Sequence, residues 1–245
     1  MNRSIRRVQL TPGYLLHQRP YRDSSRIIEV FTREFGRLTL FARAVRGGKS
    51  ALGSVLQPFQ LLLFSFSGRG DAAQLTGAEV GRPCTAVLAQ TSLMPAFYAN
   101  ELLLKLLTRD DPAPVLFDAY AELLDWLHGA KEVQAGLRIF EKRLLDAIGL
   151  GLDLVREASG GTIEPDTHYR YLSRQGIVAA GDAAGHSVRG DCLLALARED
   201  VTRPGQLTGA RAILRAAIDD ALEGRPLATR QVARELHAIE RTDGR

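Results

Sequence analysis

The spacing of apolar residues changes at about Pro83, and this change constrains the fold more than any other feature of the 245-residue chain. Before Pro83, short runs rich in Val, Ile, Leu and Phe are separated by turn sequences, which is typical of short β-strands. After it, apolar residues recur every three to four positions, which is typical of amphipathic helices. We therefore predict an α+β chain with two domains, residues 1–82 and 83–245.

The first domain is predicted to contain five strands. Residues 26–32 and 37–43 are separated by REFG, and Gly36 allows the chain to turn with a positive φ, so this pair should form a hairpin. The other three strands are expected near 8–17, 59–66 and 73–80. A small barrel of the oligonucleotide-binding type (OB-fold) has this strand count. An SH3-like barrel or a small sandwich would give a similar pattern.

The second domain is predicted to be helical, with one interruption. Residues 150–190 are rich in glycine and should form a small irregular lobe with a hairpin. The helices are expected over 91–108, 115–128, 131–149, 191–199, 208–223 and 229–241. The third of these is predicted to lie near the centre of the domain.

Positive charge is concentrated in the first third of the chain. Residues 1–80 contain 12 Lys and Arg against 5 Asp and Glu, a net charge of +7. Residues 81–245 contain 20 against 23, a net charge of −3. An asymmetry of this kind indicates that the basic domain binds a polyanion.

The Gly-Lys-Ser sequence at residues 48–50 resembles the end of a nucleotide-binding phosphate loop. The full motif is G-x-x-x-x-G-K-[ST], and it requires glycine where this chain has Arg43. The helix that should follow is poorly supported, because ALGSVLQPF contains Gly53 and is interrupted by Pro58. A nucleotide hydrolase built on this sequence is therefore an alternative hypothesis only.

Contact with nucleic acid is the other interpretation of this region. Along the strand predicted at 37–43, alternation places Arg37, Phe41 and Arg43 on one face. An aromatic ring between two guanidinium groups could stack a base and hold its phosphates. Phe41 could equally be a core residue, because small barrels bury parts of both strand faces.

Further cations lie in the neighbouring loops and strand ends. The residues predicted to contact nucleic acid are, in full, Arg19, Arg22, Arg26, Arg37, Phe41, Arg43, Arg46, Lys49 and Arg69. In an OB-type barrel, a strand face and the loops beside it form the nucleic-acid groove. A solvated basic face that only keeps the domain soluble is the alternative interpretation.

The remaining sequence features give little indication of catalysis or of membrane insertion. The five histidines are scattered without metal-ligand spacing, and no nucleophile has an identifiable base, so no enzymatic activity is expected. No apolar run reaches the roughly 18–20 residues of a membrane span, and no signal peptide is evident. A cytoplasmic location is therefore expected.

Six segments carry a family resemblance: RPYRDSSRIIEVFTREFGRLTLFARAVRG (19–47), LQPFQLLLFSFSGRG (56–70), FYANELLLKLL (97–107), LRIFEKRLLDAIGLGLDL (137–154), HYRYL (168–172) and LEGRPLATRQVARE (222–235). In their order and spacing, from about Val8 to about Leu236, they resemble the RecO family of bacterial recombination mediators. The resemblance implies an N-terminal OB-fold barrel, a C-terminal helical domain and a role without catalysis.

The resemblance also implies partners. Family members bind single- and double-stranded DNA, anneal complementary strands, and help to load the recombinase RecA onto strands coated with single-stranded DNA-binding protein (SSB). The implied partners are therefore DNA, the C-terminal tail of SSB, RecR and, indirectly, RecA. Many members carry a four-cysteine zinc site in the lobe corresponding to 150–190. This chain has no cysteine there, so it resembles the zinc-free branch and no cofactor is expected.

An acidic tail that ends in apolar residues needs a hydrophobic pocket beside cations. The helix predicted at 131–149 offers Arg138 and Lys142, four residues apart, next to Leu137 and Phe140. We predict that these four residues bind the SSB tail, and the alternative is an ordinary amphipathic helix with solvated cations. A protein-only adaptor with an incidental basic barrel is the other function left open.

Overall fold

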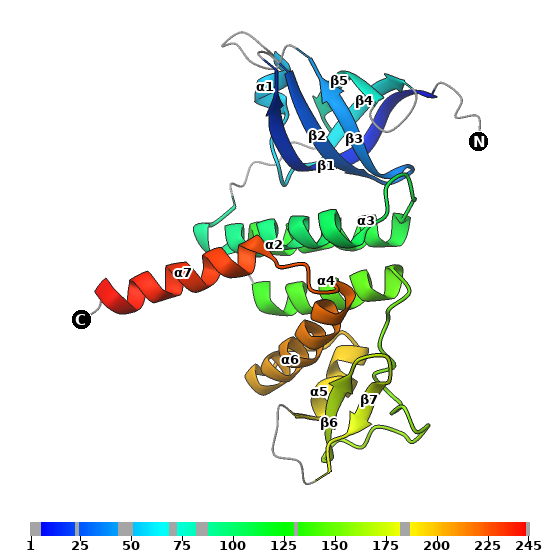
Figure 1. The fold of residues 1–245 in the computed structure, drawn as a ribbon, viewed down its shortest axis with the longest axis vertical. Helices are drawn as coiled ribbons and strands as arrows, with labels where there is room; N and C mark the ends of the chain where they lie inside the picture. Colours follow the sequence, from blue (N-terminus) through cyan, green and yellow to red (C-terminus); the bar gives the residue numbers. More distant parts are fainter. Residues whose placement is uncertain are drawn as a thin grey trace. The chain divides into compact units, whose positions relative to one another are not determined.

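The computed structural model describes residues 6–22, 25–43, 51–68, 73–81, 88–129, 132–181 and 187–243. It divides into two compact units, Met1–Leu124 and Asp125–Arg245. The first unit begins with five strands that form a closed barrel in the order β1-β2-β3-β5-β4 (Figure 1). The barrel elements are β1 (Arg6–Tyr21), β2 (Ser25–Thr32), β3 (Gly36–Ala42), α1 (Ala51–Val55), β4 (Leu62–Gly68) and β5 (Ala73–Val80). The predicted α+β chain with an N-terminal five-stranded barrel is confirmed.

The barrel is held by an apolar interior that comes from alternate residues of its strands. Along β3, Leu38, Leu40 and Ala42 are buried, while the residues between them are half-buried. The interior side chains include Leu15, Ile28, Val30, Leu40, Leu62 and Phe64, all fully buried. The interior is therefore filled without the side chains on the outer face of β3, and these are left for other contacts.

A short helix is present at a position where the residue pattern poorly supports one. Helix α1 covers only Ala51–Val55 and ends before Pro58, and residues 44–50 lie outside the described part of the chain. Gly53 is tolerated because the helix is little more than one turn long. A helix this short differs from the long helix that follows a phosphate-binding loop in nucleotide hydrolases.

Two helices, α2 (Gln90–Leu106) and α3 (Pro114–Gly129), complete the first unit, and α3 runs on past its end. The Tyr14 ring of β1 packs against Phe117 and Tyr120 of α3, with ring centroids 5.2 and 5.0 Å apart. The buried Asn100 amide of α2 donates a hydrogen bond of 3.0 Å to the backbone oxygen of Leu16. One half of the outer barrel face is therefore covered by α2 and α3.

The second unit contains α4 (Val133–Ala147), β6 (His168–Leu172), β7 (Gly176–Ala179), β8 (Val188–Arg189), α5 (Gly190–Ala197), α6 (Pro204–Ala221) and α7 (Ala228–Asp243). β6 pairs with β7 and β8 in a three-stranded sheet, within the lobe predicted at 150–190. Tyr171 and Ser173 donate hydrogen bonds of 2.8 and 2.7 Å to the Asp220 carboxylate of α6. These bonds attach the lobe to the helices of its own unit.

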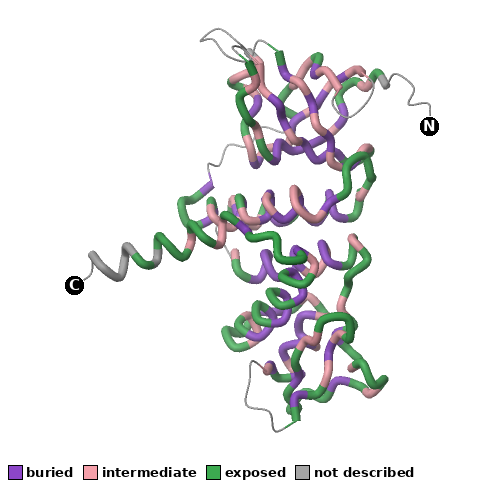
Figure 2. The backbone as a smooth tube through the Cα atoms, viewed as in Figure 1, coloured by how far each residue is buried: buried purple, intermediate pink, exposed green. Residues whose placement is uncertain are grey.

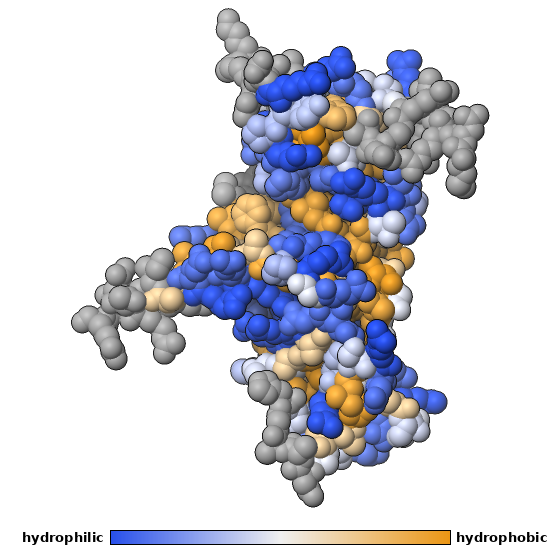
Figure 3. All heavy atoms as spheres, viewed as in Figure 1, coloured by the Kyte–Doolittle hydropathy of each residue, from blue (hydrophilic) through white to orange (hydrophobic). Residues whose placement is uncertain are grey.

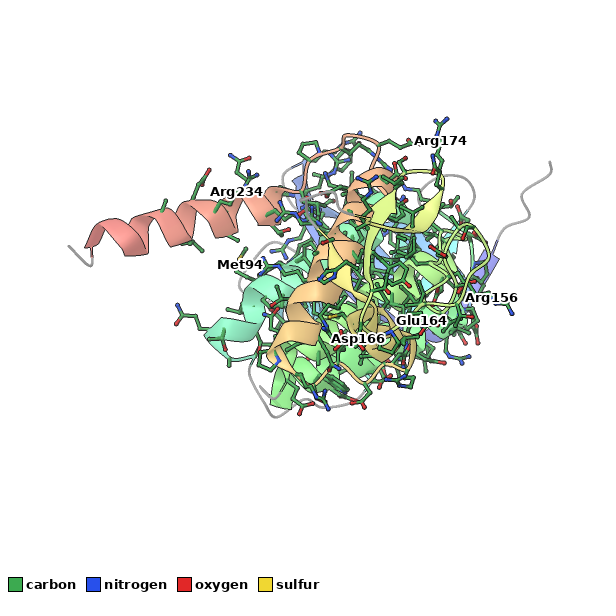
Figure 4. All side chains as sticks on the ribbon, turned by 90° about the horizontal axis from the view of Figure 1, so that it is seen from below. Met94, Arg156, Glu164, Asp166, Arg174 and Arg234 are labelled. Atoms are coloured by element: carbon green, nitrogen blue, oxygen red, sulfur yellow. The ribbon has the colours of Figure 1, made fainter. Side chains whose placement is uncertain are left out.

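Two surface features of the second unit stand out from its packed helices. Most described side chains of α7 are exposed, and the coloured part of this helix is mostly green in Figure 2. In the lobe, the exposed Arg156 and Arg174 point outward from the structure (Figure 4). Arg174 lies in the turn between β6 and β7 and has a positive φ of 63°.

The domain limits predicted from the sequence, 1–82 and 83–245, follow the change from strands to helices. The compact units follow packing instead, because α2 and most of α3 belong with the barrel.

Candidate nucleic-acid interface

The register of β1, β2 and β3 decides which predicted residues share a face of the barrel. Arg19 is paired with Ile27, and Ile27 is paired with Phe41. Residues directly opposite each other in antiparallel strands point to the same face. Because Phe41 alternates with the interior residues Leu40 and Ala42, this row lies on the outer face of the barrel.

Two aromatic rings meet at the uncovered end of this outer face. Tyr21 ends β1 and Phe41 lies near the end of β3, and their ring centroids are 5.3 Å apart with the planes tilted by 57°. Both residues are half-buried. The guanidinium carbon of Arg22 lies 5.2 Å from the centroid of the Tyr21 ring, within the range of a cation–π interaction. Phe41 is therefore a partly exposed residue of the outer face and not part of the barrel interior.

Three exposed arginines lie within two residues of the aromatic pair along the chain. Arg19 belongs to β1, Arg22 to the turn after β1, and Arg43 directly follows β3. Within the described part of the chain, neither Arg19 nor Arg43 has an ion-pair partner, so both charges are available to an external anion. Over the barrel, at the top of Figure 3, hydrophilic residues in blue predominate among the coloured atoms.

Arg26 lies on the opposite face of β2 from this group. It is paired in register with Ala42, whose side chain belongs to the barrel interior. Its guanidinium donates a hydrogen bond of 2.7 Å to the Gln18 side chain and is half-buried. The strand pairing therefore separates Arg26 from Arg19 and Phe41.

Arg37 forms an ion pair with a carboxylate of the barrel. It donates to the Glu29 carboxylate at 3.3 Å, and its side chain is only 14% exposed. The same carboxylate accepts hydrogen bonds from Thr39 at 2.8 Å and from Arg109 at 2.9 Å. Burial lowers the pKa of Arg37, and the neighbouring Glu29 opposes that change. The charge of Arg37 is therefore largely compensated within the protein.

The remaining predicted DNA contacts, Arg46, Lys49 and Arg69, lie outside the described residues. Both of their segments adjoin described strands of the barrel: residues 44–50 follow Arg43, and residues 69–72 follow β4.

Tyr21 was missed by the sequence analysis. The only signal for it was its position between Arg19 and Arg22, an aromatic residue interleaved with cations. Its approach to Phe41 depends on the pairing of both strands with β2, which the sequence pattern alone does not fix.

The residues predicted to bind the SSB tail lie on α4 and are mostly buried. Leu137, Arg138 and Phe140 are 5%, 6% and 1% exposed. The Arg138 guanidinium forms an ion pair of 2.8 Å with Glu141, whose side chain is 1% exposed. Lys142 is more accessible and contacts Asp146 at 3.3 Å and Glu199 at 3.2 Å. The four residues are therefore close in space, but both cations already have acidic partners.

Other kinds of site find little support in the described residues. They contain no group of three or more His, Cys, Asp or Glu side chains that could hold a metal ion. No helix in the described ranges combines the length and apolar character needed to cross a membrane.

The fold places the first unit among the OB-type β-barrels, and comparison with known proteins identifies the family. Residues 7–83 match the family model "Recombination protein O N terminal", and residues 91–231 match "Recombination protein O C terminal". The chain therefore belongs to the Recombination protein O (RecO) family.

Relatives of nearly equal length carry the name "DNA repair protein RecO". The protein of Nitrosococcus oceani is 44% identical over 236 residues, which cover 95% of this chain and 96% of the relative. The proteins of Ralstonia nicotianae and Methylococcus capsulatus are 41% and 42% identical over 97% and 93% of this chain, and over 88% and 94% of their own lengths.

Proposed function

We propose that this chain is a DNA-binding mediator of recombinational DNA repair, acting in the cytoplasm by binding and not by catalysis. The name shared by its relatives, DNA repair protein RecO, supports the role in repair. The observation that supports the DNA-binding role is the Tyr21–Phe41 pair at the outer barrel face, with Arg22 over the Tyr21 ring and the exposed Arg19 and Arg43 two residues away along the chain. Proteins that bind single-stranded nucleic acid commonly combine cations with aromatic rings on which bases can stack.

Phosphate contacts are assigned to the outer-face arginines and to the cations predicted in the adjoining segment, Arg46 and Lys49. Arg26 and Arg37 are given a structural role, because each is held by a neighbouring side chain. Guanidinium and ammonium groups bind phosphates of any sequence, so binding should be sequence-tolerant. With about five phosphates neutralised, the logarithm of the single-strand association constant should fall with the logarithm of salt concentration at a slope of roughly −3.5.

Annealing follows from such a surface. Two complementary strands repel each other through their phosphates, and cations that neutralise both without reading bases allow them to pair. We propose that the chain anneals complementary strands in this way and also binds double-stranded DNA. We further propose that it helps to load RecA onto SSB-coated strands, together with RecR.

The decisive experiment reverses Arg43, Arg46 and Lys49 to Glu. DNA binding and annealing should collapse while circular dichroism shows an intact fold. A matched control reverses three exposed cations of the second unit, Arg156, Arg198 and Arg211, which changes the net charge equally. If annealing survives the first set of reversals, or is lost equally with the control set, the proposed interface is wrong.

The SSB tail is proposed to bind the second unit near α4. The accessible cation there is Lys142, and the apolar side chains are Leu137 and Phe140. Because Leu137 and Phe140 are buried, binding at this place requires local rearrangement of α4 or of what covers it. Lys142→Ala should weaken binding of an SSB-tail peptide and leave binding to bare DNA unchanged. If Lys142→Ala weakens DNA binding and leaves peptide binding unchanged, the binding site for the SSB tail lies elsewhere.

A further inference from the structure

We infer that Tyr21 and Phe41 form a stacking platform for an unpaired nucleobase, and that this platform makes the barrel prefer single strands over duplex. The inference rests on the proposed DNA-binding function and adds a role for Tyr21. The cations of the outer face account for affinity to any nucleic acid, whereas the aromatic pair selects among forms of it.

The aromatic rings on the two halves of one barrel face have different neighbours. Tyr14 and Phe31 lie on the half that α2 and α3 cover, and they are 6% and 0% exposed. Phe31 packs on Phe117 of α3 with ring centroids 5.5 Å apart. Tyr21 and Phe41 lie on the other half of the same face and are only half-buried. Their rings meet each other, whereas the rings of Tyr14 and Phe31 meet Phe117 of α3.

The Tyr21–Phe41 pair is not needed to fill the barrel interior. The interior cluster is made of residues on the opposite strand faces, such as Leu40 and Ile28, which are fully buried. A tilted pair of rings at 5.3 Å leaves ring surface that a third flat group can stack against. A nucleobase is such a group, and every base has a π-face, so stacking does not depend on sequence.

Arg22 has an unusual backbone conformation beside the aromatic pair. Its φ is +53°, in the left-handed region that bulky residues seldom adopt. This conformation accompanies a guanidinium positioned 5.2 Å from the Tyr21 ring centroid. Because this guanidinium lies over one face of the Tyr21 ring, the base stacks on the ring surface of the pair that Arg22 leaves open, and Arg22 contacts the adjacent phosphate. Arg19 and Arg43 are also exposed and lie two residues from Tyr21 and Phe41 along the chain.

Selectivity follows from access to the base face. In a duplex each base is stacked between its neighbours, and unstacking it costs free energy. In a single strand the bases can be splayed out and stacked on aromatic side chains. A platform of two rings therefore adds affinity only for single strands, whereas the arginines bind both forms.

The test compares a single strand with its duplex in fluorescence-anisotropy titrations at several salt concentrations. Tyr21→Leu keeps an apolar side chain on the strand but removes the ring. It should weaken single-strand binding by between fivefold and a hundredfold, which is about the contribution of one stacked base. Duplex affinity and the salt slope should stay unchanged, and Tyr21→Phe should retain wild-type selectivity.

Arg22→Asn tests the contribution of charge separately from that of the aromatic ring. Asn tolerates a positive φ, so the turn is kept while the guanidinium is removed. The Arg22→Asn variant should bind both single strands and duplex more weakly, and the magnitude of its single-strand salt slope should be smaller by about 0.7. If Tyr21→Leu lowers the affinity for single strand and duplex equally, or changes neither affinity, the proposed stacking platform is wrong.

A strand of abasic sugar-phosphate units extends the test to the unmodified protein. It carries the same phosphates without bases, so wild-type protein should bind it as weakly as Tyr21→Leu binds the normal strand. Equal wild-type affinity for the two strands would overturn the inference even if the variant did not fold. If instead Arg19→Glu with Arg43→Glu left all DNA binding intact, the proposed function itself would fail.

Discussion

Gly36 shows how one residue can be fixed by two independent constraints. It occupies the turn between β2 and β3 with φ +67°, which favours glycine over any residue with a side chain. An added Cβ would also overlap the backbone carbonyl of Asp111, in the segment between α2 and α3. The backbone nitrogen of Asp110 donates to the Arg37 oxygen at 3.0 Å in the same region. The turn is therefore packed against the helical segment as well as sharply bent.

Gly36→Ala should accordingly destabilise the first unit by about 3 kcal/mol, since left-handed strain and backbone displacement both contribute. Gly77→Ala is the matched control in β5, because a Cβ there meets only the Ser65 Cβ, at an ordinary 3.8 Å. The control should change stability by less than about 0.5 kcal/mol. Urea unfolding followed by far-UV circular dichroism measures both. Similar midpoints for the two variants would show that Asp111 moves aside freely.

Strands and helices were predictable from the sequence because apolar periodicity is a local property. The positions of β2, β3 and β5 and of helices α2 to α7 follow the pattern, as does the turn at Gly36, whereas α1 was not predicted. The partners of the cations were not predictable, because they come from distant residues. Arg37 and Arg109 meet at Glu29 although Arg109 is 80 positions away from that carboxylate. The same limit applies to Arg138, whose spacing fits an exposed helix face but whose side chain is 7% exposed beside Glu141.

At the scale of elements, Glu199 connects the end of α5 to α4. Its carboxylate accepts hydrogen bonds from Arg143 at 3.1 Å and from Lys142 at 3.2 Å. The hydrogen bond from Arg143 is the main cause that lowers the pKa of Glu199 below its ordinary 4.5. A carboxyl with a lowered pKa in the folded state stabilises the protein above its ordinary pKa, and that stability is lost as pH falls through the lower value.

Glu199→Gln should therefore cost about 1–2 kcal/mol at neutral pH, where the charged hydrogen bonds are intact. The difference from wild type should shrink as pH falls below 4.5, because both proteins then carry an uncharged side chain. Urea unfolding at a series of pH values measures the difference. A difference that stays constant down to strongly acidic pH would show that the ion pairs to α4 contribute nothing.

The buried pair on α4 gives a second prediction at this scale. Arg138→Ala leaves the Glu141 carboxylate, 1% exposed, without the guanidinium beside it. Removing one partner of a buried ion pair typically costs about 3–5 kcal/mol, whereas replacing both by apolar residues is often neutral. Arg138→Ala should therefore be much less stable than Arg138→Met combined with Glu141→Leu. Any loss of SSB-tail binding in Arg138→Ala has to be compared with that double variant before it is assigned to a lost contact.

At the scale of the whole molecule, the stability of the barrel depends on its contacts with helices α2 and α3. Tyr14, Leu16 and Phe31 are almost fully buried, although they point away from the barrel interior. A fragment that ends at residue 82 would expose the ring surfaces that Phe117 and Tyr120 now cover. It would also leave the Leu16 carbonyl without the Asn100 amide. Exposed aromatic patches of this kind promote association.

We therefore expect the fragment 1–129, which includes all of α3, to unfold cooperatively and remain monomeric, whereas 1–82 should aggregate or unfold with a low midpoint. Size-exclusion chromatography and thermal denaturation measure both properties. The contact between α2 and the barrel can also be tested in the full chain by removing its buried hydrogen bond. Asn100→Leu should lower the free energy of unfolding by about 1–3 kcal/mol, because the Leu16 carbonyl loses its donor. If the fragment 1–82 is monomeric and as stable as 1–129, the barrel is autonomous and the boundary predicted from the sequence describes the folding unit. If 1–129 alone is stable and also binds single strands with the selectivity expected of Tyr21, then the first unit contains the DNA-binding element, and the second unit is free to receive protein partners.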